Sequence, residues 1–239
     1  MTKHIGIVAC SAEGAALCYR TICAEGEQIL GKHGHPEVSL HTHALQLYME
    51  HIDRNDWQSV ADLMLDSARK LAMGGADFLI CPDNTIHQAM PLLRPQSPLP
   101  WLHIAEVVAE EAVNKGCKRL ALTGTRSLVE SNIYPEKLSE RGLEFRRPTV
   151  QECAEIDRII FDELVRGQFL PESRDYFVEV IGRLQAEESC DGVILGCTEI
   201  PLIVTAEISP LPTLDSTRLL ARAALQHAIA EGAAAENPR

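Results

Sequence analysis

Short apolar runs alternate with longer amphipathic segments along almost the whole chain, and this alternation restricts the fold more than any other feature of the sequence. Apolar runs of about four to eight residues are typical of buried strands, whereas apolar residues three and four positions apart are typical of one helix face. Strands that are separated by helices usually pair in parallel through right-handed crossovers. The sequence therefore predicts an α/β protein. Its strands are expected at residues 4–9, 38–45, 78–81, 101–104, 119–123, 143–146, 192–195 and 213–215.

Helices are expected in the segments between these strands. In residues 57–73 the apolar side chains recur at helical spacing, and the segment is followed directly by Gly74 and Gly75. Glycine is a common residue just after the end of a helix, so the pair predicts where this helix stops. The other helices are expected at residues 152–166, 174–186 and 216–231.

Two segments, residues 76–85 and 190–199, follow one plan and predict two similar lobes. Each contains a small residue, an aspartate, a buried strand, a glycine or proline, and then a short polar cluster. Open α/β sheets bind ligands at the carboxyl ends of their strands, so both polar clusters are expected at binding edges. The prolines between residues 91 and 100 favour a crossing between lobes. We expect lobe 1 to comprise residues 1–98 and 209–239, and lobe 2 residues 99–208.

Charge and hydropathy exclude several classes of function. The chain has 22 Lys+Arg against 34 Asp+Glu, a formal net charge of -12, and only 5% aromatic residues. Nucleic-acid binding needs a basic surface, and base stacking needs aromatic side chains. No stretch approaches the roughly 18 apolar residues of a membrane span, and the first residues lack the pattern of a signal peptide. We expect a cytoplasmic protein that binds neither nucleic acid nor a membrane.

Neither the cysteines nor the histidines predict a metal site. None of the eight cysteines forms a Cys-x-x-Cys pair, and a disulfide framework is not expected in a chain of this length without a secretion signal. The pairs His33/His35 and His41/His43 have metal-like spacing, but a His-x-His pair alone is weak evidence. A surface or core role is favoured for these histidines, and no metal is expected.

Cys197 is the cysteine in the most informative position. It follows Gly196 at the end of a predicted strand and precedes Thr198-Glu199. A helix that began at this point would direct its positive end at the sulfur and favour a thiolate, which is a competent base or nucleophile. A buried structural cysteine is the alternative, and the local sequence leaves both open.

A second polar turn, Asp83-Asn84-Thr85, follows the strand predicted at residues 78–81. The amide of Asn84, the hydroxyl of Thr85 and nearby backbone N–H groups are suited to binding a substrate carboxylate. A helix N-cap with ordinary turn chemistry is the alternative reading of the same residues, and it is also left open.

Four segments spread over nearly the whole chain resemble the aspartate/glutamate racemase family of cofactor-independent amino-acid racemases. The strongest match is residues 192–203, Gly-Val-Ile-Leu-Gly-Cys-Thr-Glu-Ile-Pro-Leu-Ile, which resembles the family's segment with the second catalytic cysteine. Residues 84–87, Asn-Thr-Ile-His, correspond to the family's Asn-Thr-Ala-His pattern beside the first catalytic cysteine. Residues 122–126 resemble a Gly-Thr turn that helps to bind the substrate carboxylate, and residues 215–217 resemble the closing motif.

The resemblance implies two Rossmann-like lobes with parallel sheets, related by pseudo-twofold symmetry, and an active site in the cleft between them. It also implies that one acid/base group removes the α-proton of an amino acid and a second returns a proton to the opposite face. No pyridoxal phosphate or other cofactor is expected, so hydrogen bonds must stabilise the carbanion. The expected partner is a small amino-acid or carboxylate substrate, and the resemblance implies a homodimer.

The matched segments assign roles residue by residue. Cys197 matches the second catalytic cysteine, whereas Asp83 stands where the first cysteine is usual. We therefore expect Cys197 and Asp83 to be the opposed catalytic pair, with Asp83 acting in place of a thiol. Substrate binding is expected from Asn84, Thr85, Thr125, Thr198 and Ser11.

Two other functions are compatible with the sequence. A single catalytic cysteine suits a carbanion-type isomerase or decarboxylase of a small mono- or dicarboxylic acid, because such a reaction needs one protonation step. A catalytically weak homologue that binds a carboxylate is the second alternative, although a pure binder has no need of the Cys197 thiol. A racemase or epimerase that works on amino acids without pyridoxal phosphate is the leading hypothesis.

Overall fold

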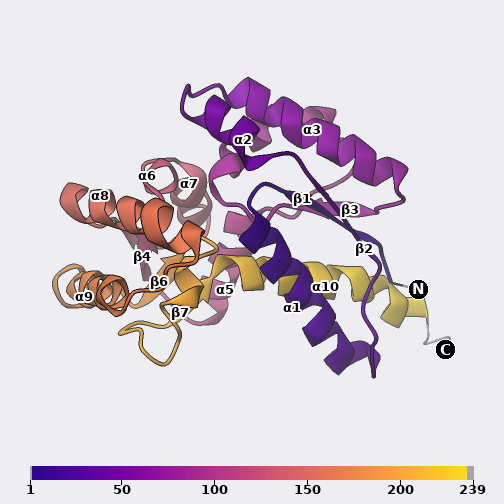
Figure 1. Ribbon diagram of the computed structural model, residues 1–239. Helices are drawn as coiled ribbons and strands as arrows, with labels where there is room; N and C mark the ends of the chain where they lie inside the picture. The colour runs from indigo at the N-terminus through magenta and orange to yellow at the C-terminus, as the bar shows by residue number, and fades with distance from the viewer. Residues whose placement is uncertain (1, 236–239) are drawn as a thin grey trace. The chain divides into compact units, whose positions relative to one another are not determined.

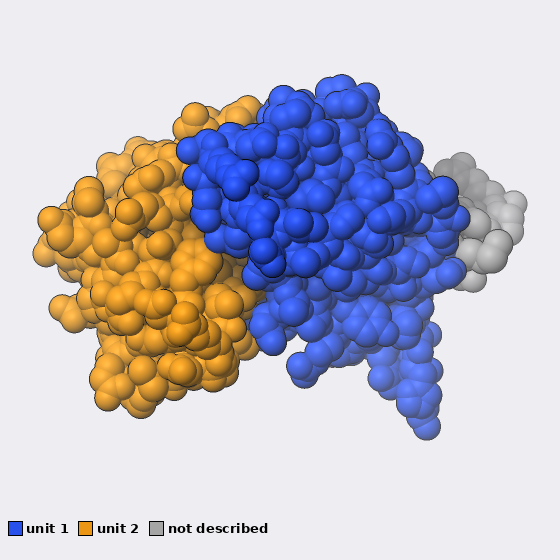
Figure 2. Space-filling model, turned by 45° about the horizontal axis from the view of Figure 1, so that its top comes forward, with its two compact units in different colours: residues 1–104, 217–239 blue, residues 105–216 orange. Residues whose placement is uncertain are grey.

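The computed structural model describes residues 2–235, and the chain forms two compact units (Figures 1 and 2). Unit 1 comprises residues 1–104 and 217–239, and unit 2 comprises residues 105–216. Each unit contains a parallel sheet with helices packed on it, so the predicted α/β class with parallel sheets is confirmed. The lobe limits expected from the sequence, after residues 98 and 208, stay a prediction.

The sheet of unit 1 has three parallel strands in the order β2-β1-β3. Helices α1 and α10 lie on one face of this sheet and α3 on the other (Figure 1). The strands and helices of this part of the chain are β1 (Ile5–Ala9), α1 (Ala12–Leu30), β2 (Val38–Thr42), α2 (Leu45–Ile52), α3 (Trp57–Met73), β3 (Phe78–Ile80), the 3₁₀ turn η1 (Thr85–Ala89), α4 (Met90–Leu93), the 3₁₀ turn η2 (Arg94–Gln96) and α10 (Ser216–Ala235).

The sheet of unit 2 has four parallel strands in the order β5-β4-β6-β7. Its elements are α5 (Ile104–Asn114), β4 (Arg119–Thr123), α6 (Arg126–Val129), α7 (Ile133–Ser139), β5 (Glu144–Arg146), α8 (Val150–Arg158), the π-helical turn η3 (Ile159–Glu163), the 3₁₀ turn η4 (Leu164–Arg166), α9 (Pro171–Glu188), β6 (Gly192–Leu195), the 3₁₀ turn η5 (Ile200–Leu202) and β7 (Thr213–Asp215). No helix of the described residues is long and apolar enough to span a bilayer.

The two sheets share one plan of strand order and one hydrogen-bonding device. In each unit the first strand is central, the second lies on one side of it and the third on the other. The aspartate before each third strand binds the start of the first strand. Asp77 Oδ2 accepts from the His4 N–H at 2.7 Å, and the Asp191 carboxylate accepts from the N–H groups of Lys118 and Arg119 at 2.8 and 3.0 Å. The similarity between the two sequence segments is therefore also a similarity in bonding.

The strand expected at residues 101–104 is wrong. Only Trp101 forms a bridge, to Leu79 of β3, and helix α5 begins at Ile104. The Ile104 N–H lies 3.4 Å from Nε2 of His87, a partner 17 positions away in the sequence. The local apolar pattern is typical of a strand. It gives no sign that His87 supplies an acceptor for the first turn of α5.

Candidate active site

The carboxyl ends of β1 and β3 carry the candidate site residues of unit 1. The crossover through α1 leads from β1 to β2, and the crossover through α3 returns to β3 on the other side of β1. The strand order therefore reverses between β1 and β3, and open α/β sheets bind ligands beside such a switch point. Unit 2 has the same reversal between β4 and β6. The residues that follow these four strands are those that the sequence selects as site residues.

Asp83 binds the turn that follows β1 with both carboxylate oxygens. Its Oδ1 accepts a hydrogen bond from the Ser11 N–H at 3.0 Å, and its Oδ2 accepts one from the Cys10 N–H at 3.1 Å. Hydrogen bonds from N–H groups to a carboxylate favour the ionised form over the acid. Asp83 therefore joins the ends of β1 and β3 as a carboxylate, and Ser11 is brought directly to it.

Two buried side chains, those of His87 and Cys81, contact the carbonyl oxygen of Asp83. The ring of His87 is buried, and its Nδ1 lies 3.0 Å from the Asp83 carbonyl oxygen. Because the Ile104 N–H donates to Nε2 of the same ring, Nδ1 carries the proton and donates to Asp83. Cys81 is fully buried two residues before Asp83, and burial and then the Asp83 charge raise the pKa of its thiol well above the usual value. Cys81 thus stays a protonated core residue.

The three polar residues expected around Asp83 lie in two different settings. Ser11 is the N-cap of α1, and its hydroxyl oxygen accepts from the Gly14 N–H at 3.2 Å. Asn84 is buried and Thr85 begins η1, the 3₁₀ turn that follows Asp83 directly. The Asn84 side chain does not cap that turn, so the N-cap alternative for Asn84 is not what the fold uses.

In unit 2 the candidate site residues follow β4 and β6, which end in a close backbone contact. The Gly196 N–H donates to the Thr123 carbonyl at 2.9 Å. A Cβ atom on Gly196 would lie 2.6 Å from that same carbonyl oxygen, so only glycine fits there. Thr125, two residues after β4, is the N-cap of α6, and its hydroxyl oxygen accepts from the Leu128 N–H. Thr125 therefore occupies in unit 2 the position that Ser11 occupies in unit 1.

Cys197 follows this glycine and is paired with a buried carboxylate. The Cys197 thiol donates to Oε2 of Glu199 at 2.9 Å, and the Thr198 hydroxyl donates to the same oxygen at 2.6 Å. Thr198 and Glu199 are buried, whereas Cys197 is partly exposed. One proton is shared between a sulfur and a carboxylate, which is an arrangement suited to moving protons.

Glu199 was not among the residues expected to act in the site. The signal that could have identified it is a carboxylate two residues after the cysteine, in a turn too tight for a long helix. The helix considered for this point is reduced to η5, which begins only at Ile200. A dipole argument for Cys197 therefore does not apply, and the Glu199 carboxylate is a group that the thiol contacts directly.

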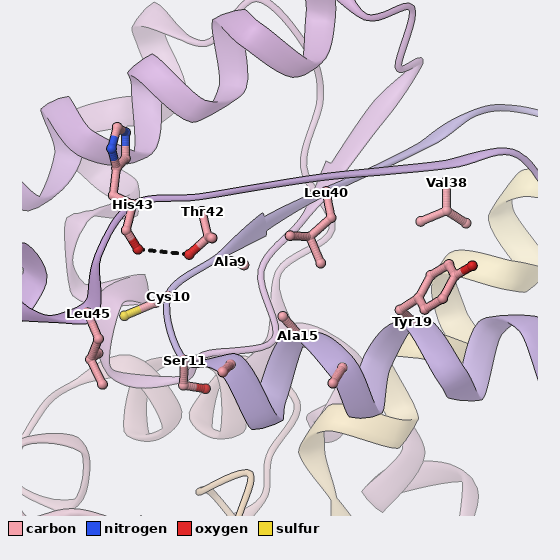
Figure 3. Close-up of a pocket in the computed structure, with 12 residues that line it drawn as sticks. Ala9, Cys10, Ser11, Ala15, Tyr19, Val38, Leu40, Thr42, His43 and Leu45 are labelled. Atoms are coloured by element: carbon pink, nitrogen blue, oxygen red, sulfur yellow. Dashed lines mark hydrogen bonds between the residues drawn. The ribbon is translucent and has the colours of Figure 1, made fainter.

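A cavity of about 650 Å³ lies beside the carboxyl end of β1 (Figure 3). Its walls come from α1, β2 and the start of α2 and include Tyr19, Leu40 and Leu45. Of the expected substrate-binding residues, Ser11 alone is part of the lining. The cavity is therefore a neighbour of the Asp83 turn and does not enclose it.

Comparison with known proteins agrees with this arrangement of strands and motifs. A sequence model of the Asp/Glu/hydantoin racemase family matches residues 7–224. The chain is 25% identical over 169 residues to the broad specificity amino-acid racemase RacX of Bacillus subtilis (strain 168), and the match covers 70% of this chain and 71% of RacX.

Solved structures give the same result over nearly the full length. The chain is similar to a protein from Yersinia pestis assigned to the Asp/Glu racemases, with a TM-score of 0.87 and 30% identity, over 95% of this chain and 99% of that one. It is also similar to an aspartate racemase homologue from Pyrococcus horikoshii OT3, with a TM-score of 0.84 and 27% identity, over 95% and 99% of the two chains. The family resemblance is therefore confirmed, and the chain belongs to the Asp/Glu/hydantoin racemase family.

Proposed function

We propose that this protein is an amino-acid racemase or epimerase that works without a cofactor. The observation that carries the proposal is the hydrogen bond between the Cys197 thiol and the buried Glu199 carboxylate, at the strand end that matches the family's second cysteine. A racemase must break and remake the bond between the α-carbon and its proton, which requires an acid/base group on each face. Cys197, supported by Glu199, is our candidate for one face.

Asp83 is the proposed group for the opposite face. Its two amide hydrogen bonds favour the carboxylate, and each carboxylate oxygen offers more than one acceptor position. In one direction Asp83 takes the α-proton and the Cys197 thiol gives a proton to the other face of the carbanion. After this transfer Asp83 holds the α-proton and Cys197 is a thiolate, and the reverse reaction starts from this state with both transfers exchanged. Before another turnover in the same direction, Asp83 releases its proton to water and the Cys197 thiolate regains one from water by way of Glu199, so protons and charge balance.

The substrate carboxylate is assigned to polar groups at the four strand ends. Ser11 and Thr125 present hydroxyls at equivalent helix N-caps, and Asn84, Thr85 and Thr198 follow the third strands. Hydrogen bonds from such groups stabilise negative charge that spreads from the α-carbon into the carboxylate. The substrate class that fits this chemistry is a free amino acid with its α-carboxylate.

The decisive experiment compares proton exchange with inversion of configuration. The purified protein is incubated in D₂O, without added cofactor, with single enantiomers of aspartate, glutamate and neutral amino acids. Loss of the α-proton is followed by NMR and configuration by chiral chromatography. The expected result is exchange together with inversion for at least one amino acid. Absence of exchange for every amino acid would refute the racemase proposal.

Variants separate the two faces. Cys197→Ser is expected to lower both exchange and inversion by about 10²–10⁴-fold, the usual contribution of a general acid or base. Asp83→Asn keeps the shape but cannot take a proton, and it is expected to abolish inversion, whereas Asp83→Cys is expected to retain or increase it. Cys23→Ser, at a partly exposed cysteine of α1, is the matched control and is expected to be unchanged. Inversion that survives Asp83→Asn would remove Asp83 from the mechanism.

A further inference from the structure

Two histidines at the end of β2 face a carboxylate on α3, outside the candidate active site. His41 lies in β2 and His43 directly follows it. Alternate residues of an extended chain point to the same side, so both rings lie together, and they make an edge-to-face contact with centroids 4.9 Å apart. The helix that packs on this side is α3, which supplies Asp66. Figure 3 shows the His43 ring directed away from the cavity, toward this helix.

The three side chains converge as metal ligands do. One donor atom from each of His41, His43 and Asp66 lies within 4.8 Å of the other two. Nε2 of His43 is 2.9 Å from Oδ2 of Asp66, but it makes no hydrogen bond with any described residue. Ligands at about 2.0–2.1 Å from a tetrahedral metal lie roughly 3.3 Å from each other. The His43 nitrogen and the Asp66 oxygen, at 2.9 Å, are about 0.4 Å closer than this, so a small outward shift of either side chain would give them the spacing of two ligands of one ion.

His41 is also oriented as a metal ligand usually is. Its Nδ1 lies 2.9 Å from Oγ of Ser67, and the Ser67 hydroxyl donates to the Leu63 carbonyl. The serine hydrogen is thus used within α3, so Nδ1 of His41 carries the proton and Nε2 keeps its lone pair. Histidine ligands of metals almost always donate their second ring N–H to such a fixed oxygen.

A neighbouring lysine competes with a cation for the Asp66 carboxylate. The Lys70 ammonium lies 2.6 Å from Oδ2 of Asp66, and a cation that uses this oxygen must displace it. Lys70 is 44% exposed, so its displaced ammonium moves into water at low cost. Imidazole nitrogens select first-row transition ions, whereas Mg²⁺ and Ca²⁺ prefer ligand sets made of oxygen.

We propose that His41, His43 and Asp66 form a binding site for a divalent first-row transition ion, of which Zn²⁺ is the first to test. Two imidazoles and one carboxylate leave at least one coordination position for water. The ion ties the end of the edge strand β2 to α3 and so stabilises unit 1. This site is independent of the proposed racemase activity, because none of its ligands belongs to the active-site residues.

Co²⁺ is the probe that separates this site from the cysteines. The chelator-treated protein is titrated with Co²⁺, followed by Zn²⁺ in competition, while absorption and thermal unfolding are recorded. The expected result is one ion per chain, visible d–d bands without the strong near-ultraviolet band of a cobalt–thiolate bond, and a higher midpoint of unfolding with Zn²⁺ bound. A thiolate band with no histidine signature, or no binding, would overturn the proposal.

Variants of the ligands and one control complete the test. Asp66→Asn and His43→Gln are each expected to weaken binding by about tenfold or more and to remove the thermal shift. Asp66 is 47% exposed on α3, so Asp66→Asn is expected to fold normally. The control is His33→Asn, in the other His-x-His pair, which no third ligand joins among residues 2–235. Equal affinity in the control and in both ligand variants would show that the ion binds elsewhere.

Discussion

Asp83 and Cys197 hold equivalent places in their units, yet their side chains are bonded in opposite ways. Asp83 turns back to the first strand and accepts from two backbone N–H groups, so its carboxylate is part of the link between β1 and β3. In unit 2 the corresponding link is made by the backbone, from Gly196 to Thr123, and Cys197 is left to pair with Glu199. A residue that also holds two strands together is under more constraint than one that does not.

Glu199 is expected to support the proton transfers of Cys197. Glu199→Gln keeps the size of the side chain but cannot take the thiol proton. We expect kcat to fall by about 10²-fold or more with little change in KM, and the dependence of kcat on pH to change. The control is Glu207→Gln, at an exposed carboxylate that follows the same turn. A kcat that stays at the parent level would show that Glu199 is only structural.

The cysteines are expected to differ sharply in their reactivity. Cys23 and Cys197 are partly exposed, and the other six are buried. Burial raises the pKa of the Cys190 thiol to about 11, and it also raises the pKa of Cys18 and Cys81. Because the thiolate is the form that reacts, iodoacetamide should modify Cys23 and Cys197 first in the native protein.

Mass spectrometry of the alkylated protein checks this expectation. A bound amino-acid substrate is expected to protect Cys197 while Cys23 continues to react, which makes Cys23 an internal control. Rapid modification of any of the six buried cysteines under native conditions would contradict the packing described above.

At the scale of the elements, the contact between β4 and β6 depends on glycine. Gly196→Ala would place a Cβ 2.6 Å from the Thr123 carbonyl oxygen and 2.5 Å from Cδ2 of Leu128. The carbonyl belongs to the sheet and cannot move aside, so we expect the free energy of unfolding to fall by about 1–3 kcal/mol.

Chemical denaturation of Gly196→Ala and of a matched variant measures this cost. Gly182→Ala lies in α9, where the nearest atom to the new Cβ is 3.8 Å away, and alanine is favoured over glycine in a helix by about 1 kcal/mol. The control is therefore expected to be equal to or more stable than the parent. Equal stability of the two variants would show that the strand contact tolerates a methyl group.

The fold followed from the sequence where the pattern is local. Strands β4, β6 and β7 and helix α3 run over the residues that the apolar pattern predicts. Strands β4 and β6 are short runs buried almost throughout, and α3 buries residues at helical spacing, so the signal lies within each segment. The segment from Trp101 to Ile104 was misassigned since the acceptor for the Ile104 N–H is His87, which only the folded chain brings there. Strand β2 ends at Thr42, three residues before the end expected from the sequence, so His43 lies outside the strand.

The site followed from the sequence less completely. The motif around Cys197 predicts that this residue is catalytic, and this stays a prediction. The contact of Glu199 with its thiol depends on the shape of a turn that ends in η5 and not in a longer helix. The amide partners of Asp83 are Cys10 and Ser11, which lie more than 70 positions earlier, so no local pattern indicates them. The cluster of His41, His43 and Asp66 brings together residues at the end of β2 and on α3 that are more than 20 positions apart, so no local pattern indicates it either.

For the whole molecule, the formal net charge of -12 opposes an anionic substrate. Local hydroxyls and amides must therefore bind a substrate carboxylate against the global field. Salt screens that field, so we expect the KM for aspartate to fall as ionic strength rises from low to physiological values, while the KM for a neutral amino acid changes less. Steady-state kinetics with both substrates test this, and a KM for aspartate that rises steeply with salt would contradict it.

The aspartates that start each third strand have a consequence for how such a chain diversifies. Asp77 and Asp191 secure the strands at the end remote from the site residues, through backbone N–H groups that every residue except proline supplies. These links lie at the end of each sheet opposite to the tip residues Asp83 and Cys197, and in unit 1 Asp83 adds a second link at the tip itself. In this chain one tip carries a carboxylate that also joins two strands, and the other carries a thiol that does not. The tip of unit 2 is therefore freer to change its chemistry than the tip of unit 1, where a new side chain must also replace the bonds of Asp83 to β1.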